Sequence, residues 1–180
     1  MALEISEFNC YDERQPTNKS SRVQNIDTAQ KLWKEGAKLL LSGDVYEAIR
    51  RFDESLEIKP TAEGYTYRGW AISRLGRVDE AIDECKKAIQ LDPNFGNSYN
   101  DIGVYLLRKV GAEKAIPWFE RAKRARRYGA RHYPCLNLGR IYLARGEKMR
   151  ALDEFLEGLA YRPGNCELLA AIESVKYSVN

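Results

Sequence analysis

The stretch Gly76-Arg77-Val78-Asp79-Glu80-Ala81-Ile82 decides the fold of this chain, because its pattern occurs three times. Residues 43–49 repeat it as Gly-Asp-Val-Tyr-Glu-Ala-Ile, and residues 146–152 repeat it as Gly-Glu-Lys-Met-Arg-Ala-Leu. Four residues after its alanine, each copy carries Phe52, Cys85 or Phe155. A recurring order of turn glycine, alanine and bulky residue indicates a chain built from equivalent units.

Two series of small residues give the length of the unit. Glycines at 36, 69, 103 and 139 and alanines at 48, 81, 115 and 151 advance in steps of 33, 34 and 36 residues. A period near 34, divided by a glycine turn and closed by a proline at 60, 93 or 163, is typical of stacked helical hairpins. The sequence therefore predicts an all-α array, and such arrays present an extended binding surface.

The pattern predicts a tail, four repeats and a cap. Residues 1–27 lack helical periodicity and are expected to form a poorly ordered tail, with Asp27 or Thr28 capping the first helix. Asn165 is expected to cap a closing helix at 166–178, with Glu173 facing solvent. Between them, from residue 28 to residue 165, the repeats are expected at about 29–61, 62–95, 96–131 and 132–165.

This unit resembles the tetratricopeptide repeat, and the resemblance covers about residues 29–165. It implies a right-handed α-solenoid of four hairpins whose first helices line a concave groove. It also implies a non-enzymatic protein–protein interaction scaffold or adaptor that binds a peptide segment of a partner in that groove.

The groove positions that the resemblance assigns carry three kinds of side chain. Aromatic rings are suited to apolar anchoring, asparagine amides to bonding a peptide backbone, and arginines to binding carboxylates. Alternatively, the aromatic residues only pack between neighbouring helices or under the tail. The candidate peptide-binding residues are Trp33, Tyr67, Trp70, Arg74, Asn97, Asn100, Arg108, Tyr133, Asn137 and Arg140.

The third repeat departs from the pattern in spacing, proline and charge. Pro117 stands inside the expected second helix, so a kink or a late helix start is expected near it. Basic residues prolong that helix, which is expected to stop at Tyr128-Gly129. They form a candidate basic patch of Arg121, Lys123, Arg124, Arg126, Arg127 and Arg131.

This basic patch supports an alternative function, which is binding of a polyanion or nucleic acid through the 121–131 helix. No RNA-recognition motif accompanies it, so an acidic protein partner is the preferred interpretation and nucleic acid is disfavoured. A second alternative is a self-assembling structural protein, and a homo-oligomer stays open.

One specialised partner is disfavoured by the sequence. In tetratricopeptide domains that bind acidic chaperone C-termini, Lys, Asn and Arg side chains hold the terminal carboxylate. The matching residues here are Trp33, Ala37, Tyr67, Asn97 and Asp101, and none of them suits that task. Chaperone C-terminal tails are therefore not expected as partners.

An enzymatic function is not expected. His132 is the only histidine, and the glycines stand singly rather than in a phosphate-binding loop, so no catalytic residue, metal site or cofactor is predicted. The four cysteines include no Cys-x-x-Cys pair and are expected to be reduced. With no secretory signal and no apolar run long enough to span a membrane, a cytoplasmic location is expected.

Overall fold

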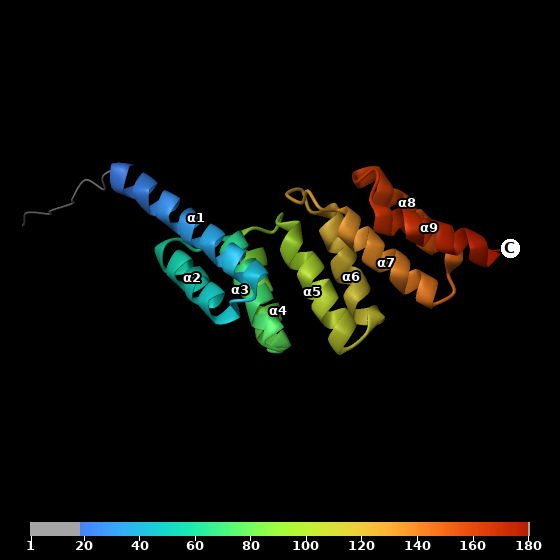
Figure 1. Cartoon of the computed structure of the whole chain (residues 1–180), viewed down its shortest axis with the longest axis horizontal. Helices are drawn as coiled ribbons and strands as arrows, with labels where there is room; N and C mark the ends of the chain where they lie inside the picture. Colours follow the sequence, from blue (N-terminus) through green and yellow to red (C-terminus); the bar gives the residue numbers. More distant parts are fainter. Residues whose placement is uncertain (1–18, 180) are drawn as a thin grey trace, which may run out of the picture.

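The computed structural model describes the backbone of residues 19–179 and the side chains of residues 25–176. This part of the chain is all-α: hairpins stack side by side along the long axis as an α-solenoid (Figure 1). The hairpins are α1 (Lys19–Ser42) with α2 (Val45–Ile58), α3 (Ala62–Arg74) with α4 (Val78–Leu91), α5 (Gly96–Lys109) with α6 (Ala112–Arg124), and α7 (His132–Ala144) with α8 (Lys148–Tyr161). The capping helix α9 (Cys166–Val179) ends the array.

The first helix begins earlier than the sequence indicated. It starts at Lys19, so Asp27 and Thr28 lie inside α1 and do not cap it. Residues 19–27 show no apolar periodicity, but extending a helix that has already nucleated adds one hydrogen bond per residue without needing a buried face. The rest of the expected tail, residues 1–18 with Cys10, lies outside the described residues.

Within each hairpin the glycine of the first helix lies against the bulky residue of the second. A Cβ on Gly36 would stand 2.8 Å from the Phe52 ring, and one on Gly103 would stand 2.6 Å from the Phe119 ring. Phe52, Phe119 and Phe155 are completely buried. The repeated pattern of glycine and aromatic residue therefore sets the close approach of the paired helices.

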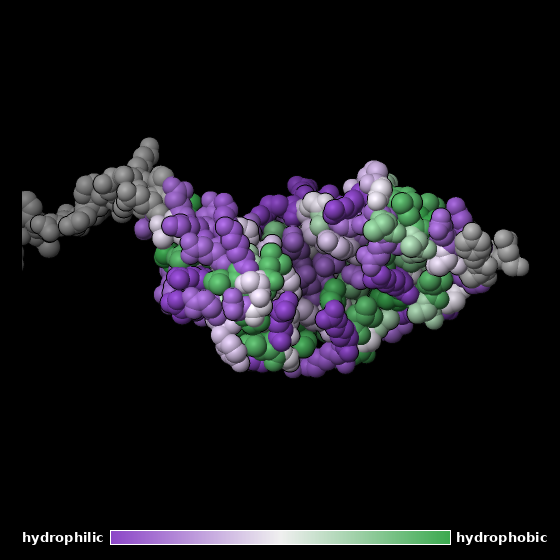
Figure 2. Space-filling view, viewed as in Figure 1, coloured by the Kyte–Doolittle hydropathy of each residue, from purple (hydrophilic) through white to green (hydrophobic). Residues whose placement is uncertain are grey.

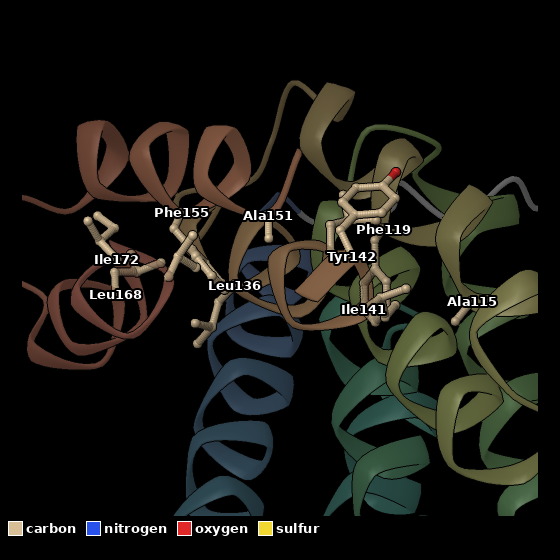
Figure 3. Close-up of a cluster of buried hydrophobic side chains, with 11 residues drawn as sticks. Ala115, Phe119, Leu136, Ile141, Tyr142, Ala151, Phe155, Leu168 and Ile172 are labelled. Carbon is tan, nitrogen blue, oxygen red and sulfur yellow. The ribbon is translucent and has the colours of Figure 1, made fainter. Parts of the chain in front are cut away.

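The largest buried cluster joins the last two hairpins to α9 (Figure 3). Leu136 and Tyr142 of α7 pack with Phe155 of α8, and Leu168 and Ile172 of α9 complete the cluster. The expected Asn165 cap is present, because its Oδ1 accepts a 3.0 Å hydrogen bond from the Leu168 amide. Glu173 is exposed at the free face of α9.

The second helix of the third repeat differs from its prediction at both ends. Because α6 begins at Ala112 and continues through Pro117, the late start is wrong. It ends at Arg124, before the expected stop at Tyr128-Gly129, so the expected basic 121–131 helix is only partly helical. Residues 125–131 turn back instead, and the Arg127 amide donates to the Asn94 carbonyl at 2.9 Å.

Candidate functional site: the central groove

The first helices of the second and third repeats run side by side and enclose a groove. Thr66 on α3 and Ser98 on α5 join the two helices by a hydrogen bond between their buried hydroxyls. The hollow has a volume of about 450 Å³. We call it the central groove and define it by its lining residues: Thr66, Tyr67, Trp70, Ser73, Arg74, Asn97, Asp101, Val104, Tyr105 and Arg108.

Five of the ten candidate peptide-binding residues meet in the central groove: Tyr67, Trp70, Arg74, Asn97 and Arg108. The Tyr67 and Trp70 rings stand edge to face with centroids 6.0 Å apart, and both side chains are only partly buried. Arg74 and Arg108 are exposed. The groove therefore combines accessible aromatic surface with cationic groups at its edge, a combination typical of interfaces.

Trp33 lies next to the central groove but lines a different hollow. Its ring packs edge-on against Tyr67 at 5.2 Å, continuing the aromatic row onto α1. The second hollow, of about 330 Å³, lies between α1 and the start of α3, with Ala29 and Thr61 among its lining residues. Part of the alternative interpretation thus holds for Trp33, because this ring also packs between helices.

The remaining four candidates do not line the central groove. The Asn100 side chain donates a 3.4 Å hydrogen bond to Asp101, and its own oxygen is buried with no partner among the described residues. On α7, Tyr133 stacks on His132 at 4.1 Å, and Arg140 pairs with Glu167 of α9. Asn137, also on α7, is partly buried. These residues belong to the C-terminal half of the array.

Asp101 is the one carboxylate among the groove residues, and it was not among the candidate peptide-binding residues predicted from the sequence. It is partly buried on α5, and within the described part of the chain no Lys, Arg or His forms an ion pair with it. Burial raises the pKa of Asp101 to about 7, and the hydrogen bond from Asn100 offsets this shift only in part. Its place in the groove follows from the repeat frame, but its burial depends on the packing of Tyr67 and Tyr105 around it.

Half of the expected basic patch is used inside the molecule. Lys123 is nearly buried, with Nζ 2.8 Å from Glu154 and 2.6 Å from Glu157 of α8. Arg131 donates to backbone carbonyls, at 2.6 Å for that of Ala125. For these two residues an exposed patch is the wrong description, because Lys123 reaches across to two carboxylates of α8 and Arg131 bonds backbone carbonyls of residues 123–126.

Arg127 is the third basic residue with an internal role. It pairs with Glu63 of α3 and, at 2.6 Å, with Asp92, while its guanidinium covers the Phe95 ring. It thereby ties the 125–131 segment to the second repeat. Arg127 is itself still exposed, as are Arg121, Arg124 and Arg126.

The one cluster of metal-ligand type among the described side chains consists of Cys135, Glu154 and Glu157. Lys123 already donates hydrogen bonds to both carboxylates. Burial raises the pKa of Cys135 to about 12, so its thiol stays protonated. This arrangement is that of a buried ion pair rather than a metal centre.

The comparisons with known proteins agree with the repeat frame. The model of the tetratricopeptide repeat family matches residues 62–95, which comprise α3, α4 and their turns. The chain carries tetratricopeptide repeats. Proteins built from them act as protein-interaction scaffolds, and the fold is typically non-enzymatic.

Three similar proteins illustrate the match. The small glutamine-rich tetratricopeptide repeat-containing protein 2 of Mycosarcoma maydis is 29% identical over 54% of this repeat chain and 28% of its own length. The structure of pilF from Pseudomonas aeruginosa superimposes with a TM-score of 0.77 at 20% identity, over 88% of this chain and 71% of that one. The second tetratricopeptide repeat domain of Spaghetti (RPAP3) was solved with the HSP90 peptide SRMEEVD bound. It superimposes with a TM-score of 0.54 at 20% identity, over 59% of this chain and 98% of that one.

The repeat chain spans less than a third of the length of the curated relatives it matches first. These similarities therefore concern the array itself. Among residues 19–179, no helix is both long and apolar enough to cross a membrane.

Proposed function

We propose that this chain is a non-enzymatic scaffold that captures a peptide segment of a partner protein in its central groove. The observation that carries the proposal is the 450 Å³ hollow between α3 and α5, where Tyr67, Trp70, Asn97, Arg74 and Arg108 converge. Each has a role that a bound peptide would use. The aromatic rings offer apolar contact, the Asn97 amide offers bonds to a peptide backbone, and the arginines offer bidentate bonds to acidic side chains.

Two features argue against acidic chaperone tails as the partner, although a similar fold binds such a peptide in Spaghetti. The carboxylate of Asp101 faces the same groove and would repel a terminal carboxylate. Asn97 and Asp101 also stand where the chaperone-binding domains carry cations.

The groove is favoured over polyanion or nucleic-acid binding for an electrostatic reason. Four of the six residues in the expected basic patch already have partners within the protein: Lys123, Arg124 and Arg127 form ion pairs, and Arg131 bonds backbone carbonyls. Arg74 and Arg108, in contrast, form no ion pair with any described residue. A cytoplasmic location and a possible homo-oligomer remain predictions from the sequence.

A selection of random 12-residue peptides displayed on phage tests the proposal. Selected peptides are synthesised with a fluorophore and titrated against three proteins by fluorescence polarisation. The groove variant is Arg74→Glu/Arg108→Glu. The control Lys114→Glu/Arg126→Glu makes the same change of charge at exposed residues outside the groove. We expect the groove variant to lose at least about 10-fold in affinity and the control to keep it. Equal loss in both variants, or none in either, would contradict the proposal.

A further inference from the structure

The carboxyl group of Asp101 is partly buried, and among the described side chains it has no cationic partner. It accepts a long hydrogen bond from the Asn100 side chain, at 3.4 Å. Arg74 and Arg108 line the same groove, yet neither forms an ion pair with it. Removing a carboxylate from water without a cation costs free energy, so a fold that keeps one in a hollow is at a disadvantage until a cation arrives.

The walls around Asp101 also suit a cation. Tyr67 and Trp70 present rings from α3, and Val104 adds aliphatic surface from α5. Aromatic faces attract ammonium and guanidinium groups, while apolar surface accommodates the methylene stem that carries them.

An unsatisfied polar group in the same hollow points to a ligand. Tyr105 is 6% exposed and lines the central groove, and its hydroxyl has no hydrogen bond of good geometry within the described structure, because the nearby Ser73 hydroxyl donates to the Trp70 carbonyl instead. Buried polar atoms without partners are uncommon in native proteins. A donor that enters beside Asp101 would supply the missing partner.

We propose that the central groove receives a lysine or arginine side chain of the bound peptide, held by the Asp101 carboxylate between the aromatic walls. Arg74 and Arg108, at the edge, then favour an acidic residue elsewhere in the same peptide. The partner segment is thus one of mixed charge, with a basic residue that is buried and an acidic residue that is not. This inference rests on the proposed function and specifies its ligand.

The peptides selected on the wild-type protein provide the test. We expect them to share one Lys or Arg, and its replacement by norleucine, which keeps the stem and removes the charge, to weaken binding at least about 10-fold. On the Asp101→Asn variant, whose shape is nearly unchanged, the same replacement should alter affinity by less than about 2-fold. Circular dichroism verifies that the variant is folded.

Each outcome is informative. Peptides that bind the wild type and lose affinity for Arg74→Glu/Arg108→Glu, but share no basic residue, would leave the proposed function standing and overturn this inference. A basic residue that matters equally for wild type and Asp101→Asn would overturn it too. If no selected peptide depends on the groove, both proposals fail.

Discussion

The hydroxyls of Thr66 and Ser98 lie 2.6 Å apart and form a hydrogen bond between the first helices of two consecutive repeats. Both residues are buried, at 2% and 0% exposure, so water offers no substitute partner. This contact lies beneath the central groove and fixes the distance between its two walls.

The first prediction concerns this pair. Thr66→Val should destabilise the protein by about 1–3 kcal/mol, because it leaves the Ser98 hydroxyl buried and unsatisfied. Adding Ser98→Ala should recover part of that loss, since the stranded hydroxyl is then gone. Urea denaturation of the two single variants and the double variant measures the coupling. Strictly additive effects would show that the two hydroxyls do not depend on each other.

The second prediction concerns the glycine of the fourth hairpin. A Cβ on Gly139 would stand 2.3 Å from the Phe155 ring, so Gly139→Ala should cost about 1–3 kcal/mol of stability through overpacking. Gly129→Ala is the matched control, because nothing lies within 4 Å of its Cβ. Thermal unfolding should separate the two variants. A tolerated Gly139→Ala would show that the helices of this hairpin are farther apart than described.

The third prediction concerns pH. The pKa of Asp101 is about 7 in the folded protein, against about 3.9 for an ordinary aspartate, so folding favours its protonated form. Its contribution to stability therefore falls as the pH rises from about 4 to about 7. Asp101→Asn should be more stable than wild type by about 1–2 kcal/mol at pH 8, with a smaller difference at pH 5.

Chemical denaturation at the two pH values measures this effect, with the exposed Asp153→Asn as control. A wild type more stable than Asp101→Asn at pH 8 would mean that the carboxylate already has a stabilising partner. The expected result would mean that Asp101 lowers the stability of the free protein, as residues of binding sites often do.

The fourth prediction concerns the buried ion pair of the C-terminal half. Burial alone would lower the pKa of Lys123, but hydrogen bonds from its ammonium to Glu154 and Glu157 outweigh burial and raise it. Lys123→Met should cost about 3 kcal/mol, because the Glu154 carboxylate stays buried without its cation. Arg124→Met, at a side chain 71% exposed, should change stability by less than about 0.5 kcal/mol. Urea denaturation distinguishes them, and similar effects would contradict the pairing.

The sequence was sufficient for the parts of the fold that depend on a repeated local pattern. Glycine facing aromatic residue recurs in register, so Gly36 and Phe52 predict the packing that Gly139 and Phe155 repeat. Departures from the pattern were harder. No apolar periodicity in residues 19–27 predicts that α1 begins at Lys19. The chain leaves the helical conformation after Arg124, where Arg127 contacts residues distant in the sequence.

The sequence predicted which positions line the groove, but it did not predict which charged side chains are paired or buried. The resemblance to the tetratricopeptide repeat placed Tyr67, Trp70 and Arg74 on the inner face of a first helix, and all three line the central groove. Whether a charged side chain forms an ion pair depends on contacts with the second helices and with the 125–131 segment. For that reason Lys123 was mistaken for a surface cation, and Asp101 was not selected.

The most direct test of peptide capture in the central groove uses the three tryptophans of the chain as reporters. A peptide selected on the wild type is titrated into 15N-labelled protein, and the three indole N–H signals are followed by NMR. Trp70 lines the groove, whereas Trp118 lies on α6 and packs near Tyr99. We predict that the Trp70 signal shifts with saturation while the Trp118 signal stays in place. A shift confined to Trp118, or no shift of any indole at saturation, would contradict capture in the central groove.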